Sequence, residues 1–103
     1  MIEFESDMEI PGDFTGHCKE LIFGNEYWYI EGLLHREDGP AVVYKSGVKY
    51  WYRHGEKHRE DGPCEEHCDG YMVYCLFGTY YDEKEYYEHP LVLKHKLNSI
   101  LSL

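Results

Sequence analysis

The sequence has few basic residues and no long apolar run. Its 103 residues include 10 Lys and Arg against 20 Asp and Glu, a net charge of −10. This balance repels phosphate groups, so it disfavours direct binding to nucleic acid. No stretch approaches the ~18 apolar residues of a membrane span, and the first residues have neither the basic start nor the apolar segment of a signal peptide. We therefore expect one cytoplasmic domain that does not enter a membrane.

Motifs of catalysis and cofactor binding are also missing. The sequence has no Gly-x-Ser-x-Gly elbow, no phosphate-binding glycine loop before a helix, no Cys-x-x-Cys pair and no metalloprotease box. We predict from this that the chain is not an enzyme and carries no cofactor.

What the sequence does contain is a tandem repeat. The segment His-Arg-Glu-Asp-Gly-Pro at 35–40 recurs letter for letter at 58–63, an offset of 23 residues. The same offset aligns three columns of glycines, namely Gly16, Gly39 and Gly62, then Gly24, Gly47 and Gly70, then Gly32, Gly55 and Gly78. Three ungapped copies indicate a repeat array, and the first copy is the least regular, as terminal repeats often are.

Each repeat has the pattern of a β-hairpin. In the middle copy, 41–45 and 48–53 have the composition of strands, and Ser46-Gly47 predicts a two-residue turn between them. His54-Gly55 predicts the next turn, and Asp69-Gly70 predicts the equivalent turn of the third copy. Short turns join antiparallel strands. The expected fold is mainly β, an antiparallel meander of about six or seven strands in a single twisted sheet of hairpin repeats.

The repeats occupy residues 16–81 of a single domain, with a segment at each end. Residues 1–15 are expected to supply an edge strand around Ile2 and Phe4. In the tail, 82–103, Asp82 and Glu85 form a capping box that opens a helix, and Pro90 suits the start of a second one. We expect the apolar stripe of this second helix to close the sheet, with a partner or a homodimer as the alternative. The stripe consists of Leu93, Leu97, Ile100 and Leu101.

The unit at 47–63 resembles a variant of the MORN repeat, through its period, its Gly-x-x-Tyr start and its Gly-x-x-His step. It is more closely similar to the "HREDGPA" repeat proteins of phages, large viruses and bacteria. The resemblance covers roughly 16–81, and departs from the pattern at Cys64, where Ala is expected, and at 65–68, where an apolar strand is expected. It implies an interaction module that binds proteins or lipid head groups, and a small accessory protein of a phage.

The His-Arg-Glu-Asp segment admits two interpretations. His58 with Asp61 or Glu60 could perform acid–base chemistry. The same residues recur at 35–38, however, and a repeat needs its turn chemistry in every copy, whereas an active site needs its residues once. The pattern therefore favours a structural connector, with a ladder of ligand-binding charges as the alternative.

The cysteines suggest reduced thiols. A two-residue turn at Asp69-Gly70 would set Cys64 opposite Cys75, with Cys68 on the same face. A zinc site needs four converging ligands, and only these three converge, with Glu66 an imperfect fourth. We predict no metal site, and free thiols in a reducing cytoplasm. A metal site and a Cys64–Cys75 disulfide are the alternatives.

The aromatic residues fall into columns. Trp28, Trp51 and Tyr74 form one column, and Tyr27 and Tyr50 lie beside it. These rings either pack within the sheet or form a binding surface flanked by acids, suited to a basic partner. The predicted partner-binding residues are Trp28, Tyr50, Trp51, Tyr74, Arg36, Asp38, Arg59 and Asp61.

Together these observations predict a non-enzymatic protein-interaction module. We expect an accessory or inhibitor protein of a phage or mobile element that binds a host or defence protein, with a basic partner favoured by the charge of −10. Two alternatives stay open. One is an acidic decoy that occupies the nucleic-acid channel of a defence enzyme. The other is a protein that sequesters a small ligand or nucleotide with its aromatics and with Arg36 and Arg59.

Overall fold

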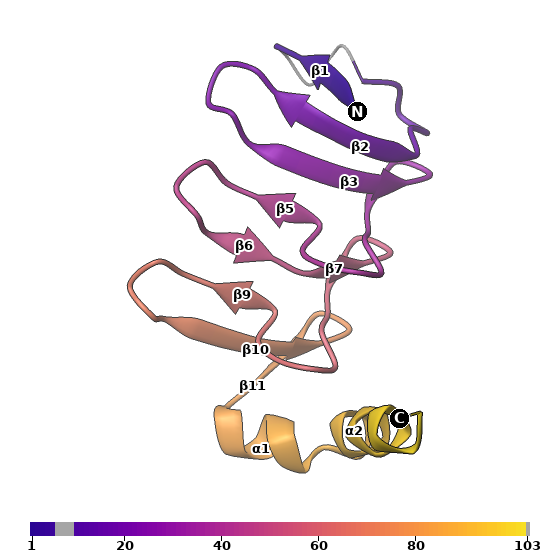
Figure 1. Cartoon of the computed structure of the whole chain (residues 1–103), viewed down its shortest axis with the longest axis vertical. Helices are drawn as coiled ribbons and strands as arrows, with labels where there is room; N and C mark the ends of the chain where they lie inside the picture. The colour runs from indigo at the N-terminus through magenta and orange to yellow at the C-terminus, as the bar shows by residue number, and fades with distance from the viewer. Residues whose placement is uncertain (6–9, 103) are drawn as a thin grey trace.

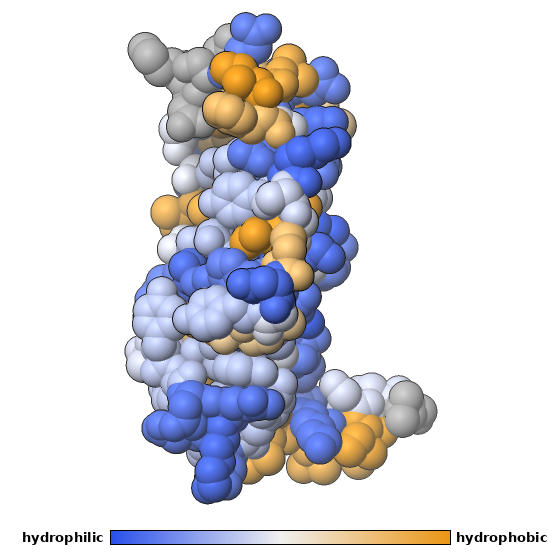
Figure 2. Space-filling view, turned by 90° about the vertical axis from the view of Figure 1, so that its left-hand side faces the viewer, coloured by the Kyte–Doolittle hydropathy of each residue, from blue (hydrophilic) through white to orange (hydrophobic). Residues whose placement is uncertain are grey.

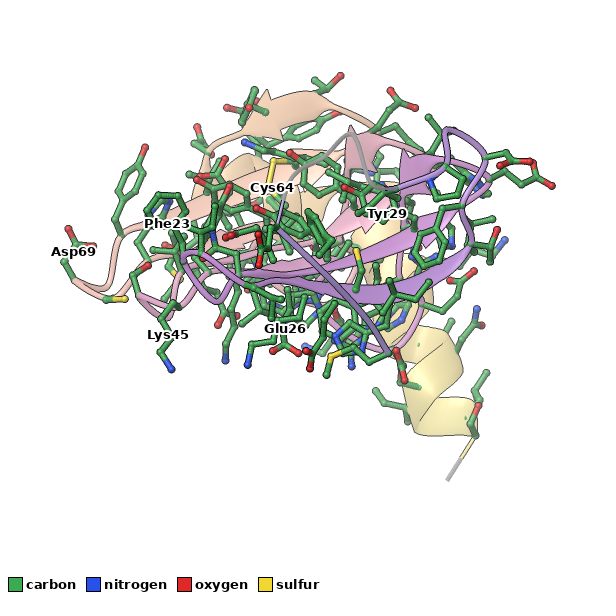
Figure 3. All side chains as sticks on the ribbon, turned by 90° about the horizontal axis from the view of Figure 1, so that it is seen from above. Phe23, Glu26, Tyr29, Lys45, Cys64 and Asp69 are labelled. Atoms are coloured by element: carbon green, nitrogen blue, oxygen red, sulfur yellow. A yellow bond between two sulfur atoms is a disulfide. The ribbon has the colours of Figure 1, made fainter. Side chains whose placement is uncertain are left out.

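The computed structural model describes residues 1–5 and 10–102. Residues 6–9, part of the predicted N-terminal segment, and residue 103 lie outside this range. The chain forms an elongated stack of 42 × 29 × 26 Å. The hairpins follow one another from the N-terminal end to two helices at the opposite end (Figure 1). Seen along the stack, Phe23, Lys45 and Asp69 lie on the same side, because the hairpin tips are superposed (Figure 3).

Most of the strands belong to one sheet, in the order β1-β2-β3-β5-β6-β9-β10-β11, with β4 beside β3. Its strands are β1 (Ile2–Phe4), β2 (Gly16–Glu20), β3 (Glu26–Ile30), β4 (Leu33–Leu34), β5 (Val42–Val43), β6 (Lys49–Tyr50), β9 (Glu65–Glu66), β10 (Met72–Leu76) and β11 (Thr79–Tyr81). The edge strand β1 pairs with β2 in parallel, and the other pairs are antiparallel. The predicted mainly β meander is thus confirmed.

A second, smaller pair consists of β7 (Tyr52–Arg53) and β8 (Glu56–Lys57). It exists because the returning strand of the middle hairpin is interrupted at Trp51, between β6 and β7. The strands are therefore shorter and more numerous than the hairpin pattern predicted. The interruption separates the long hairpin of the middle repeat from the short one that follows it, whereas β3 and β10 pass the equivalent position without a break.

The two kinds of hairpin use different turns. His54-Gly55 is a two-residue turn, as predicted, with Arg53 opposite Glu56 and φ of 49° and 81°. Positive φ at both positions is the requirement of a type I′ turn. The turns predicted at Ser46-Gly47 and Asp69-Gly70 are one residue longer. Tyr44 N donates to Val48 O and His67 N donates to Tyr71 O, so three residues lie between the paired ones in each case.

Helix α1 (Glu83–Glu88) closes the end of the stack. The predicted cap is confirmed, since Glu85 N donates to Asp82 Oδ1 at 2.7 Å. Tyr86 is fully buried, and its hydroxyl donates to Arg59 O and accepts from Gly62 N at 3.2 Å. Counted by the repeat offset, α1 occupies the place of a third His-Arg-Glu-Asp segment. A buried tyrosine thus replaces the connector that would lead to another repeat.

Helix α2 (Pro90–Leu101) begins at the predicted proline, but its apolar stripe does not close the sheet. Leu93, Leu97, Ile100 and Leu101 are all more than half exposed. The first turn of α2 packs on the body, where Val92 joins Leu76 and Tyr86 in one buried cluster. The prediction failed because Tyr86 of α1 already covers the end of the sheet. Figure 2 shows α2 extending sideways from the lower end of the stack, with apolar surface along it.

Candidate functional site

Residues 35–40 and 58–63, here called connector 1 and connector 2, join each hairpin to the next. His35 and His58 are buried. His35 Nδ1 accepts a hydrogen bond from His54 N, and His58 Nδ1 accepts one from Phe77 N, each at 2.8 Å. The donor residues have φ of 49° and 48°. Each histidine therefore holds the positive-φ turn that lies 19 residues further along the chain.

The accepting Nδ1 carries no proton, so the ring proton lies on Nε2. That nitrogen faces the glutamate of its own connector, Glu37 at 3.2 Å and Glu60 at 3.3 Å. The first repeat lacks the histidine and uses Thr15 Oγ1, which accepts from Glu31 N at 2.8 Å. Because both ring nitrogens already have partners, the histidines are committed to turn geometry in both copies. This arrangement favours the structural interpretation of the repeated segment.

The arginine of each connector is held by its own aspartate and by a tryptophan. The guanidinium of Arg36 stacks 3.9 Å from the ring centre of Trp28, and Arg59 stacks at the same distance on Trp51. Their Nε atoms donate to Asp38 and Asp61 at 2.8 Å. Six of the predicted partner-binding residues are thereby brought together as two equivalent Trp–Arg–Asp triplets. In the second, Arg59 Nη1 also donates to Glu66 Oε2 at 2.7 Å.

The remaining two predicted residues lie elsewhere. Tyr74 occupies the tryptophan column of the third repeat, but it packs on the rings of Tyr86 and Tyr87 of α1. Burial raises the pKa of Tyr74 to about 12. Tyr50 contacts Tyr44 and the ammonium of Lys57. Neither tyrosine therefore joins the two triplets on one continuous surface.

The two connectors enclose a groove of about 400 Å³. We call it the connector groove and define it by Glu37, Asp38, Trp51, Arg53, Glu60, Asp61 and His95, the last of which comes from α2. A second hollow of about 340 Å³ shares Glu60, Asp61 and His95 and continues under α2 to Tyr87, Val92 and Lys96. We call it the helix hollow. Because the two share residues, they form one furrow along connector 2.

Carboxylates dominate the rim of this furrow. The side chains of Glu37, Asp38 and Asp61 are 67%, 84% and 60% exposed. The hydrogen bond with His35, with help from Arg53, lowers the pKa of Glu37. The hydrogen bond with Arg36 lowers the pKa of Asp38. Glu37 and Asp38 therefore stay charged at neutral pH, and although each is paired with an arginine, their exposed oxygens can accept further hydrogen bonds from a cation.

The cysteines are arranged differently from the prediction of free thiols. Cys64 and Cys75 form a disulfide, with their Cα atoms 5.5 Å apart, and Figure 3 shows its yellow bond at Cys64 between the strands. Cys18 and Cys68 stand outside the disulfide. Cys68 lies in the turn at 68–70, which is one residue longer than predicted, so it does not belong to a strand. Its thiol is exposed and donates to Ser46 O at 2.8 Å.

Residues 1–5 and 10–102 contain no cluster of three or more histidine, cysteine, aspartate or glutamate side chains placed to hold a metal. None of the helices described is long and apolar enough to cross a membrane. Comparison of the chain with known protein families, curated proteins and solved structures finds no match in any of the three.

Residue patterns missed the members of the furrow that come from outside the connectors. Arg53 lines it from β7, and Tyr87, Val92 and His95 line it from the helices. The repeat alignment contained one signal for Arg53. Its equivalent in the last repeat is Leu76, so this position carries a charge in one copy and none in the other. The helical residues had no such signal, since their positions depend on how α1 and α2 dock.

Proposed function

We propose that this chain is a non-enzymatic protein-interaction module that binds a basic protein partner along its connectors. The observation that carries the proposal is the furrow itself, a hollow between connectors whose rim is formed by exposed carboxylates. Its aromatic and cationic components are already fixed in place by the Trp–Arg–Asp triplets. Rigid, charged and aromatic surfaces of this kind bind proteins at little cost in side-chain entropy.

The resemblance to "HREDGPA" repeat proteins extends this proposal. We place the chain among the accessory or inhibitor proteins of phages and mobile elements, acting on a host or defence protein. The net charge of −10 supports a basic target, because opposite charges accelerate the encounter of two proteins.

The proposal is tested by affinity recovery from a lysate of the native host. Wild-type chain is expected to retain one partner in stoichiometric amount, and the variant Asp38→Asn/Asp61→Asn is expected to retain much less. The matched control is Glu3→Gln/Glu31→Gln, which removes the same charge at exposed sites of the N-terminal segment and the first repeat. Recovery of no partner, or equal recovery by all three proteins, contradicts the proposal.

The small-ligand alternative is less favoured by the geometry. Arg36 and Arg59 were expected to bind the ligand together with the aromatic residues, but each arginine is stacked on tryptophan and bonded to its aspartate. The decoy alternative rests on charge along the whole chain and not on one surface. The salt dependence of partner binding distinguishes the decoy from a module with a local site, because binding through many dispersed charges weakens more steeply with ionic strength.

Self-association through α2 is a second proposal, which the exposed stripe supports. α2 has no acidic residue and carries Lys94 and Lys96 beside the stripe, while α1 presents Glu83, Glu85 and Glu88. Two copies related by a twofold axis can therefore set α2 of each against α1 of the other. We expect a concentration-dependent dimer in sedimentation that Leu97→Glu abolishes and Phe23→Glu, at the opposite end, preserves. A monomer at every concentration refutes it.

A further inference from the structure

The two connectors have the same sequence but differ in their contacts. Connector 2 is bonded by Tyr86 and by Glu66, whereas connector 1 is held by an arginine from β7 that connector 2 lacks. Glu37 faces His35 and is also held by Arg53, whose Nη1 lies 2.8 Å from Oε2 and whose Nη2 donates to Glu37 O at 3.5 Å. The residue equivalent to Arg53 in the next repeat is Leu76, which is buried against Tyr86 and Val92. Glu60 therefore has the histidine of its connector but lacks the arginine.

Glu60 lies where connector 2 meets the helices. Within residues 1–5 and 10–102, the one polar contact of its carboxylate is with His58, at 3.3 Å. His95 and Lys96 of α2 line the same hollow, but neither forms an ion pair with Glu60 in this part of the chain. The side chain is 28% exposed, against 67% for Glu37. A cation that reached it would be sheltered from solvent screening more than one on the outer rim.

The residues that line the hollow beside Glu60 indicate which kind of side chain could bind next to the cation. The helix hollow passes from Glu60 and Asp61 to Tyr87 and Val92. A carboxylate pair and an aromatic and aliphatic wall thus stand at adjacent positions along one furrow. A side chain with a planar, charged end fits the first part, and an apolar side chain fits the second.

We infer that the helix hollow binds an arginine of the partner protein, with its guanidinium on Glu60 as Arg53 is placed on Glu37 within connector 1, and a neighbouring apolar side chain against Tyr87 and Val92. The inference rests on the proposed function, because the arginine belongs to the partner. Arginine is preferred to lysine, since its planar fork can bond a carboxylate and a carbonyl together, as Arg53 does.

The test is a titration of isotopically labelled chain with acetyl-Arg-Leu-amide, followed through the backbone amide signals. We expect shifts at connector 2 and at the start of α2, centred on Glu60, Asp61 and Val92. The peptide with citrulline in place of arginine has nearly the same shape and no charge, and should bind at least about tenfold more weakly, as expected for the loss of a charge-assisted hydrogen bond. Equal binding of the two peptides overturns the inference.

Two variants locate the site. Glu60→Gln should weaken binding of the arginine peptide about tenfold, whereas Glu3→Gln, the same change at the other end of the stack, should leave it unaltered. Arg53→Leu places the residue type of Leu76 beside connector 1 and frees Glu37 of its arginine, so a second set of shifts should appear at Glu37. The appearance of this second set of shifts does not depend on whether the Glu60→Gln variant folds. Unchanged binding by Glu60→Gln, or no new shifts in Arg53→Leu, is the contrary result.

These outcomes separate the inference from the proposed function. If the lysate partner is retained through Asp38 and Asp61 but the arginine peptide does not bind, the module function stands and the arginine hollow fails. If the peptide binds as expected but no partner is retained, the hollow stands and the proposed function fails.

Discussion

The middle and last repeats place different side chains at equivalent positions. Ala41, Val42, Tyr52 and Arg53 of the middle repeat correspond to Cys64, Glu65, Cys75 and Leu76 of the last. The middle repeat is followed by connector 2 and a further hairpin, whereas the last is followed by α1. Where another repeat follows, these positions hold small, aliphatic and aromatic residues and one arginine. Where the helical cap follows, the same positions hold the two cysteines of the disulfide, a glutamate in a mostly buried ion pair with Lys57, and a leucine. The neighbour therefore decides which contacts a repeat needs.

The cap offers the largest expected effect. Tyr86→Ala removes a fully buried ring and two hydrogen bonds, and should lower the free energy of unfolding by roughly 3–5 kcal/mol. Urea denaturation measures this loss, and the adjacent exposed residue provides the control, Tyr87→Ala, with a much smaller effect. Equal effects of the two substitutions would show that α1 is not the element that closes the last repeat.

The disulfide is the next test. The double variant Cys64→Ala/Cys75→Ala gives the last repeat the alanine of the middle one at position 64, and removes a link that spans 11 residues. It should lower the free energy of unfolding by about 3 kcal/mol, as should reduction of the wild-type chain, while Cys68→Ala should leave it unchanged. If thiol reagents modify Cys64 and Cys75 in the native chain under non-reducing conditions, the disulfide is contradicted.

The two buried histidines test whether the repeats are alike where their sequences agree. His35→Leu and His58→Leu each leave a backbone N–H without its acceptor, which should cost about 1–3 kcal/mol. Hydrogen exchange should accelerate at the His54 amide in the first variant and at the Phe77 amide in the second. An effect in one connector only would show that the two copies are not equivalent.

The smallest effect is the pH dependence contributed by Glu65, which stands where the middle repeat has Val42. Burial acts to raise the pKa of Glu65, but hydrogen bonds from Lys57 and His67 outweigh it and hold the pKa below 4.5. A lowered pKa means that the unfolded chain binds the proton more readily. The contribution to stability is thus present above pH 4.5 and is lost as the pH falls through the folded-state pKa.

Glu65→Val should therefore flatten the acid limb of the stability profile, measured by thermal unfolding between about pH 3 and pH 6. Glu3→Gln is the control, because Glu3 is exposed. An acid limb that is equally steep in the wild type and in Glu65→Val would show that other groups produce the dependence.

Several features could be predicted because they depend on residues close together in the chain. The 23-residue offset, the turn at His54-Gly55, the cap at Asp82 and the edge strand at Ile2–Phe4 all follow from local backbone preference and alternation. The turns at 45–47 and 68–70 were predicted one residue too short, because glycine at the last position suits both lengths.

The repeat period, the hairpins and the acidic charge of this chain are properties of its sequence, since they arise from neighbouring residues and from composition. The tertiary structure decided the rest. It placed α1 where a third connector would stand, left the stripe of α2 exposed and left Glu60 without the arginine that its twin possesses. Each of these outcomes depends on contacts between segments that lie apart in the sequence, so the free energy of packing that decides them cannot be read from neighbouring residues.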